Sequence, residues 1–155
     1  MILSKGINRN DIALGSAFDK DWLHSHDLRR SPFKDLKLLR NKRVAAVLNH
    51  VSPTSATWNG GNSSAWKKDI LSVNGFDESM HYGAEDREFG ERLINRHVFG
   101  LQVRYSAVCI HLDHTRDYMN EEDLKRNKEK YQHTRSTKSR WTSCGIIKSE
   151  EPRRN

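Results

Sequence analysis

The feature that most constrains the fold is the stretch GGNSSAWKKDILSVNGFDESMHYGAEDREFGERL, residues 60–93, in which turn residues, helical spacing and paired acids follow one another. Apolar residues recur at helical intervals in its first part, and Asn74-Gly75 ends that helix because both residues tolerate positive φ. After a loop, Glu85 and Asp86 open a second amphipathic helix, whose N-terminus favours negative charge. The stretch therefore predicts two helices joined by a turn and a loop.

Short apolar runs on either side of this stretch predict strands. The run RVAAVLNHV, residues 43–51, is rich in Val and predicts a buried strand. The runs LQVRY and AVCIHL, residues 101–105 and 107–112, predict two more strands. A charged helix is then expected from the capping Asn120 onward. The chain is thus expected to contain both helices and short strands.

The length of 155 residues is that of one ordinary domain. Apolar residues make up 35% of the chain and charged residues 30%, which is typical of a modest core within a polar surface. We expect residues 1–42 to form a poorly patterned, helical and basic lead-in, residues 43–147 to form one module, and residues 148–155 to form a disordered tail.

The chain is basic, with 27 Lys and Arg against 20 Asp and Glu and a net charge of +7. This charge favours phosphate-bearing ligands, nucleic acid or an anionic membrane surface without choosing among them. The basic segments 28–43 and 125–140 are accompanied by no aromatic platform, helix-turn-helix signature or zinc pattern. A solvated charged face explains them better, and nucleic acid is not an expected partner.

Cysteine usage and hydropathy bear on the location of the protein. Cys109 and Cys144 lie in unrelated segments and form no C-x-x-C pair, which disfavours a disulfide scaffold or a zinc finger. No apolar run approaches the roughly 18 to 20 residues that span a bilayer, and the N-terminus lacks the apolar core of a signal peptide. We expect a cytoplasmic protein, with peripheral association at the inner face of the membrane as an alternative.

The adjacent acids Glu85 and Asp86 are the first candidate site. Two carboxylates at a helix start often do no more than complement the helix dipole. Here they follow Tyr82 and Gly83 in HYGA, where small residues would let a ligand approach the backbone. A base that acts on a sugar hydroxyl needs a fixed, ionised and reachable carboxylate, and the first turn of a helix after an open loop provides one.

The glycine pair Gly60-Gly61 most often marks a hairpin or a strand-to-helix turn, and this is the favoured interpretation of the glycines by themselves. The pair is not part of a P-loop, because the spaced Gly-Lys-Ser/Thr is missing. In the functional alternative, their backbone amides lie against a ligand sugar or phosphate, and Asn62 and Ser63 offer hydrogen bonds.

Two histidines follow the last predicted strand in HLDHTRD. His111 and His114, together with Asp113, can bind a divalent metal ion. Alternatively, one histidine is a surface residue at the strand end and Asp113 pairs with Arg116. A strand would turn the two histidines onto opposite faces unless it bends, and the spacing alone leaves the two interpretations evenly balanced.

A metal-binding D-x-D is matched formally by Asp19-Lys20-Asp21. Such a motif belongs at the end of an apolar strand, whereas the flanking GSAF and WLHSH look helical. We therefore do not expect a metal site there.

Taken in order, GGNSSAW, VNGFDE, YGAEDREFGERL and HLDHTRD resemble the C-terminal half of the catalytic domain of GT-A glycosyltransferases of the family 2 type, which shares a module with the β-1,4-galactosyltransferases. The resemblance covers residues 56–120 well. It implies an α/β, partial GT-A (nucleotide-diphospho-sugar transferase) fold, with a small mixed sheet flanked by helices and with the N-terminal nucleotide-binding half largely absent.

The resemblance also implies a reaction, namely inverting transfer from a nucleotide sugar, expected to be a UDP-sugar, to a saccharide or glycolipid acceptor in polysaccharide biosynthesis. Asp86 matches the catalytic base, and Glu85 matches the neighbour that helps to hold the acceptor. His114 matches the histidine that ligates Mn²⁺ or Mg²⁺ on the donor diphosphate, and His111 falls where the related module supplies a second ligand. The substrate-binding residues that the resemblance implies are Gly60, Gly61, Asn62, Tyr82 and Gly83.

Relatives of this kind carry an upstream nucleotide-binding half that ends in D-x-D, for which this chain has no room before residue 40. We therefore expect a fragment of a longer gene product, with an exposed sheet edge through which it would self-associate. The alternative function is that of a non-catalytic carbohydrate- or partner-binding remnant of such an enzyme. A basic nucleic-acid binder is the least favoured hypothesis.

Overall fold

The computed structural model describes residues 2–4, 7, 9–25, 41–112 and 120–148. It divides into two compact units, unit 1 with Met1–Ser55 and Gln102–Thr115, and unit 2 with Ala56–Leu101 and Arg116–Asn155. Each unit has a small hydrophobic core of its own. The domain boundaries expected at residues 42 and 147 stay a prediction.

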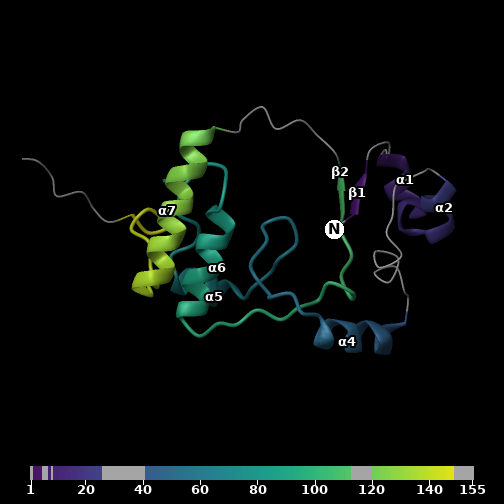
Figure 1. Ribbon diagram of the computed structural model, residues 1–155, viewed down its shortest axis with the longest axis horizontal. Coiled ribbons are helices and arrows are strands. Elements are labelled where there is room, and N and C mark those ends of the chain that lie inside the picture. The colour runs from purple at the N-terminus through teal and green to yellow at the C-terminus, as the bar shows by residue number, and fades with distance from the viewer. Residues whose placement is uncertain (1, 5–6, 8, 26–40, 113–119, 149–155) are drawn as a thin grey trace, which may run out of the picture. The chain divides into compact units, whose positions relative to one another are not determined.

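Unit 1 combines short helices with one pair of strands. Its elements are β1 (Ile2–Ser4), α1 (Arg9–Ala13), the 3₁₀ helix η1 (Ser16–Phe18), α2 (Lys20–Ser25), α4 (Lys42–Val51) and β2 (Ile110–Leu112). The strands β1 and β2 pair in parallel, with Leu3 opposite His111 (Figure 1). The buried residues of its core are Ile7, Ala17 and Leu23.

The predicted buried strand at residues 43–51 is wrong, because this segment forms the helix α4. Asn41 caps the helix, and its Oδ1 accepts hydrogen bonds from the amides of Arg43 and Val44 at 3.0 and 3.2 Å. Three valines of α4 are exposed, so the apolar run is not buried as a strand interior would be. Periodicity alone does not separate a strand from a helix in so short a run, and the cap favours the helix.

The predicted strand at residues 101–105 is also wrong. This segment ends in a turn that is tied to α4, because the Tyr105 amide donates to Oδ1 of Asn49 at 2.8 Å. The Asn49 side chain also donates to the Ser106 hydroxyl at 2.8 Å. Of the strand predicted at residues 107–112, only the last part is confirmed, as β2.

The predicted α/β fold, a partial GT-A fold with a small mixed sheet flanked by helices, is therefore contradicted. In the described part of the chain, helices dominate, and the strand pairing consists of β1 with β2 and one isolated bridge between Cys144 and Lys148. Two strands of three residues each are too small to hold layers of helices. Self-association through the edge of a larger sheet stays a prediction.

Unit 2 is built on three helices, α5 (Lys67–Ser72), α6 (Glu85–Asn95) and α7 (Glu121–Thr137). Helices α6 and α7 pack side by side (Figure 1). All three were predicted from the sequence and are confirmed, as is the cap of α7, where Oδ1 of Asn120 accepts from the Glu122 amide at 2.9 Å. Among the described residues, no helix is long and apolar enough to cross a membrane.

The turn predicted at Asn74-Gly75 is confirmed as well. The two residues have φ values of 66° and 71°, in the left-handed region that Asn and Gly tolerate. The amides of Asn74 and Gly75 donate to carbonyls of α5, which closes the helix. The turn therefore ends α5 and redirects the chain toward the loop before α6.

Phe89 of α6 is the centre of the core of unit 2. Its ring meets Trp58 edge-on, with centroids 4.7 Å apart, and stacks on Phe76 at 4.4 Å. Val73 and Leu93 complete the buried cluster. A Cβ added to Gly90 would lie 2.6 Å from the Cβ of Trp58, so only glycine lets this tryptophan pack so closely on α6. The core thus ties the chain just before the glycine pair to the helix that begins with the two acids.

Candidate functional site

The side chain of Asp86 meets the glycine pair at the N-terminus of α6. Its Oδ2 accepts a hydrogen bond from the Gly60 amide at 3.2 Å, and its Oδ1 accepts one from the Arg87 amide at 2.7 Å. The side chain is half-buried, and residues far apart in the sequence are thus brought together. Two residues that the sequence singled out separately therefore form one cluster.

Glu85 closes the turn that precedes α6. Its Oε2 accepts a hydrogen bond from the Gly83 amide at 2.5 Å. The turn is tight, with φ of 111° at Gly83 and 65° at Ala84. This contact is a structural one, so at least one oxygen of Glu85 is used to shape the loop that presents Asp86.

Helix α7 packs against the loop that precedes α6. A Cβ on Gly83 would lie 2.2 Å from Cδ2 of Leu124, so α7 packs directly against the glycine backbone. The fully buried Asn127 donates from Nδ2 to the carbonyl of His81 at 3.0 Å and to that of Tyr82 at 3.4 Å. Sequence reasoning missed Leu124 and Asn127. Their spacing of three on an otherwise charged helix was the available signal.

The glycine pair lies in a compact turn. The Asn62 amide donates to the Asn59 carbonyl at 2.9 Å, and the Asn59 amide donates to the hydroxyl of Ser63 at 2.8 Å. Oδ1 of Asn59 also accepts from the Gly61 amide at 3.2 Å. The turn is exposed, so its backbone is accessible from solvent.

Neither glycine of the pair is required by the folded chain. A Cβ on Gly60 would lie 3.7 Å from the Cβ of Asp86, and one on Gly61 would lie 3.6 Å from Oδ1 of Asn59, both ordinary contacts. Neither residue has a positive φ. Gly83, in contrast, has both a positive φ and a clash with Leu124. The internal packing thus leaves the glycine pair unexplained, whereas the approach of a ligand to the backbone would explain it.

Of the two predicted metal ligands, His111 is among the residues that the structure describes. The backbone of His111 lies in β2 of unit 1, and His114 lies outside the described residues. Within the ranges that the structure describes, no three His, Cys, Asp or Glu side chains converge as a metal site would require. The metal assignment to His111 and His114 stays a prediction.

Asp19 of the formal D-x-D has a structural role. Its Oδ1 accepts from the amides of Asp21 and Trp22 at 3.0 and 2.9 Å, which caps α2. The helical flanks predicted around this motif are confirmed by η1 and α2.

The geometry at Asp86 suits proton transfer. An ionised carboxylate offers about four lone-pair positions, of which the two backbone amides use two. The two hydrogen bonds fix the orientation of the group and leave it able to accept a proton from a hydroxyl that reaches the half-buried site. Of the residues implied for substrate binding, Gly60 contacts Asp86 directly, whereas Gly83 lies against Leu124 of α7.

Comparison with protein families gives a match to this chain. A family model described as the N-terminal domain of galactosyltransferase matches residues 42–135, which is more than half of the chain. The matched range contains the glycine pair, α6 and most of α7. No curated protein matches the chain, and no solved structure matches it. The description names an N-terminal domain, so the assignment of the motifs to a C-terminal half stays a prediction.

Proposed function

The chain belongs to the family described as the N-terminal domain of galactosyltransferase, and from this premise we propose that it performs an inverting transfer of a sugar from a UDP-sugar to a hydroxyl of a saccharide or glycolipid. The observation that supports the proposal is the cluster at the start of α6, where the Gly60 amide holds Asp86 at 3.2 Å. Family membership supports glycosyl transfer in general. The donor, the acceptor and the residue roles are the proposal.

In the proposed reaction, Asp86 accepts the proton of the acceptor hydroxyl as that oxygen attacks the anomeric carbon of the donor sugar. The new glycosidic bond forms as the bond between the anomeric carbon and the diphosphate breaks. The bonding electrons leave with the nucleotide diphosphate, and attack from the opposite face inverts the anomeric centre. A positioned carboxylate base typically contributes about 10²–10⁴-fold to the rate.

The neighbouring residues have supporting roles in this proposal. Glu85 fixes the turn before Asp86 through the Gly83 amide and thereby helps to hold the acceptor. Tyr82 lies in the loop that Asn127 anchors, where it would contact the sugar rings. The exposed turn at Gly60 and Gly61 would let the donor sugar approach the backbone, with Asn62 beside it.

The proposal includes a divalent ion, Mn²⁺ or Mg²⁺, with His111 and His114 as its predicted ligands. Such an ion would neutralise charge on the departing diphosphate. The ligand set depends on His114, and the described residues by themselves form no cluster that would hold an ion. The roles proposed for the residues of this chain are therefore substrate binding and proton transfer.

The test is the variant Asp86→Asn, assayed for UDP release and sugar transfer from UDP-galactose, UDP-glucose and UDP-N-acetylglucosamine to saccharide acceptors. We expect transfer to fall by about 10²–10⁴-fold, because an amide accepts no proton. The fold should persist, since the single amide oxygen still accepts one of the two backbone hydrogen bonds that the carboxylate accepts. The matched control is Asp69→Asn, which removes a carboxylate from the first turn of α5 and should leave transfer unchanged.

An Asp86→Asn variant as active as the wild type would remove Asp86 as the base. If the wild-type chain binds a saccharide but transfers no sugar from any of the three donors, the enzyme hypothesis is wrong. The alternative, a non-catalytic carbohydrate-binding protein, would then be favoured.

A further inference from the structure

A second part of unit 2 contains an open hollow, away from the acids at the start of α6. The hollow, of about 410 Å³, lies between α7 and the segment that follows it, and Asp86 is not among the residues that line it. The volume falls within the range of roughly 300–1,000 Å³ that is typical of small-molecule sites. The lining residues on which the argument depends are Asp77, Glu88, Lys130, Thr134, Trp141 and Thr142.

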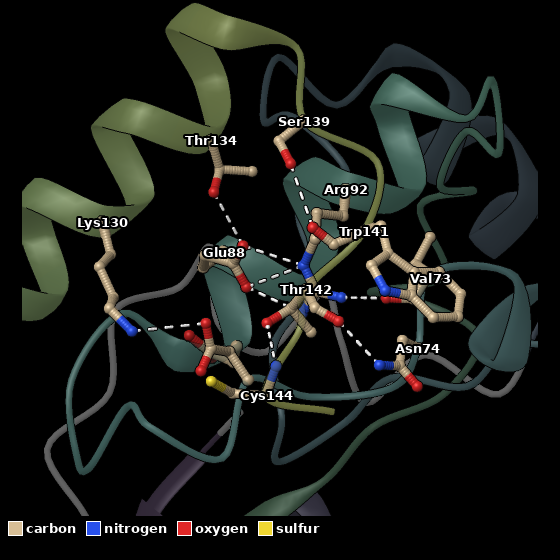
Figure 2. Close-up of polar contacts among 12 residues, drawn as sticks. Val73, Asn74, Glu88, Arg92, Lys130, Thr134, Ser139, Trp141, Thr142 and Cys144 are labelled. Atoms are coloured by element: carbon tan, nitrogen blue, oxygen red, sulfur yellow. Dashed lines mark hydrogen bonds and ion pairs between the residues drawn. The ribbon is translucent and has the colours of Figure 1, made fainter. Parts of the chain in front are cut away.

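Trp141 presents its ring on a segment that is held firmly on either side. The carbonyl of Ser139 accepts from Nδ2 of Asn95 at 2.8 Å, and the carbonyl of Thr142 accepts from Nδ2 of Asn74 at 2.7 Å. Asn74 and Asn95 are both buried. Figure 2 shows the contacts of Asn74 with Thr142 and of Ser139 with Trp141. Trp141 nevertheless remains 46% exposed, so a large apolar surface stays open on a rigid support.

The polar groups of the hollow are also held in place. The Thr134 hydroxyl donates to Oε1 of the buried Glu88 at 2.8 Å (Figure 2). Lys130 bridges α7 to Asp77 at 3.5 Å. Thr142 is buried beside them. Groups that are already ordered lose little conformational entropy when a ligand binds. The hollow is therefore organised in advance of binding.

The charges around the hollow favour an uncharged ligand. Most charged side chains of the lining are paired, since Lys130 faces Asp77, Glu88 faces Arg92 at 2.9 Å, and Arg126 faces Asp123 at 2.5 Å. Glu129 adds a further carboxylate to the lining, which disfavours an anion, and His133 adds an imidazole. Charges that are already neutralised attract an anion weakly, but their carboxylates and ammonium groups still exchange hydrogen bonds with hydroxyls. A sugar ring offers hydroxyls at its edge and C–H groups on its face, and the C–H groups carry partial positive charge that suits the face of an aromatic ring.

We propose that this hollow binds an uncharged saccharide, with a sugar ring stacked on Trp141 and its hydroxyls hydrogen-bonded to the carboxylates and hydroxyls of the lining. That the saccharide is a distant part of the acceptor rests on the proposed function, whereas binding itself does not. The site is separate from the catalytic cluster. Glu88 and Asp86 are two positions apart on α6, which turns them about 200° from each other around the helix.

The experiment is a calorimetric titration of the full chain with three neutral trisaccharides, namely triacetylchitotriose, cellotriose and maltotriose, with ligand-observed saturation-transfer NMR for weak binding. We expect at least one trisaccharide to bind. The variant Trp141→Ala should raise its dissociation constant by about tenfold or more, the loss typical of truncating a stacked aromatic anchor. Trp141→Phe keeps an aromatic face and should restore most of the affinity, which separates stacking from a loss of folding.

The matched control is Trp66→Ala, since Trp66 is 77% exposed and does not line the hollow. This variant should bind the trisaccharide as the wild type does. Failure of all three trisaccharides to bind, equal binding by Trp141→Ala, or displacement of the bound trisaccharide by inorganic phosphate would each overturn the proposal. Because the titration needs neither donor nor turnover, its outcome is independent of the Asp86→Asn assay.

Discussion

At the scale of single residues, four glycines of unit 2 fall into two groups. Gly83 and Gly90 are required by packing, because a Cβ would lie 2.2 Å from Leu124 in the first and 2.6 Å from Trp58 in the second. Gly60 and Gly61 meet no such obstacle and are exposed. The first group maintains the fold, and the second leaves its backbone accessible beside Asp86.

The variant Gly60→Ala separates these roles. Because its φ lies outside the left-handed region and the new Cβ would meet only ordinary contact, we expect stability to stay the same or to rise by about 0.4–1 kcal/mol. Sugar transfer should fall, since the methyl group would occupy the space proposed for the donor. Thermal unfolding and the transfer assay on the same preparation measure the two effects.

Gly83→Ala is the contrasting variant. With φ of 111° and the clash with Leu124, it should lose about 1–3 kcal/mol of stability or more. If Gly60→Ala transfers sugar at the wild-type rate, the role proposed for the glycine pair is contradicted, whether the stability of the variant is unchanged or raised.

At the scale of elements, a buried ion pair joins α6 to its neighbours. Arg92 is fully buried, and its Nε and Nη2 donate to the carboxylate of Glu88 at 2.9–3.0 Å. Nη1 of Arg92 also donates to the carbonyl of Val73 at the end of α5, and Thr134 of α7 donates to Glu88 at 2.8 Å. The three helices of unit 2 therefore meet at this one pair (Figure 2).

Glu88→Gln should destabilise unit 2 by about 3–5 kcal/mol, because it leaves the Arg92 charge buried without its partner. The exposed pair between Arg126 and Asp123 provides the control, and Asp123→Asn should change stability by no more than about 1 kcal/mol. Denaturant unfolding measures both. If Glu88→Gln unfolds at the same denaturant concentration as Asp123→Asn, the buried pair does not hold the helices together.

At the scale of the whole molecule, stability depends on pH. The chain carries a net charge of +7, and the ionised carboxylate of Asp77 contributes to the stability of the fold. Burial raises the pKa of Asp77, but the hydroxyl and amide of Ser79, the Lys130 ammonium and the Thr142 hydroxyl together lower that pKa below its ordinary value. These contacts connect the loop after α5 to α7 and to the segment beyond it. Asp77 therefore makes part of the stability depend on pH.

The sign of this dependence follows from the lowered pKa. The contribution of Asp77 is complete above the unfolded value of about 3.9 and disappears as the pH falls through the lower folded value. We expect Asp77→Asn to melt at a lower temperature than the wild type at neutral pH. The difference should shrink on acidification to about pH 3 and below, where the wild-type carboxyl becomes protonated.

Glu78→Gln is the matched control, because the side chain of Glu78 is exposed and pairs with Lys148 at the surface. Its melting temperature should follow that of the wild type across the same range. A melting difference for Asp77→Asn that is constant with pH would show that ionisation of Asp77 is not the source of stability.

Local signals were enough to predict several elements of this protein from its sequence. The helices α5, α6 and α7, the cap at Asn120 and the left-handed turn at Asn74-Gly75 each depend on residues a few positions apart. The acids at the start of α6 were identified in the same way, and their catalytic roles stay predictions. A helix cap, the periodicity of apolar residues and the placement of acids at a helix start each depend on a short segment. They can therefore be recognised in a single sequence.

The remaining features were decided by contacts between distant positions. Whether residues 43–51 form a strand or a helix is ambiguous in the sequence, and the structure makes them α4. The packing of Leu124 on Gly83, the burial of Arg92 and the hollow beside Trp141 join segments that the sequence separates by tens of residues. The sequence by itself determined the local helices and the order of the motifs. Only the tertiary structure decided which side chains meet, because burial and packing depend on the whole arrangement of the unit rather than on neighbours along the chain.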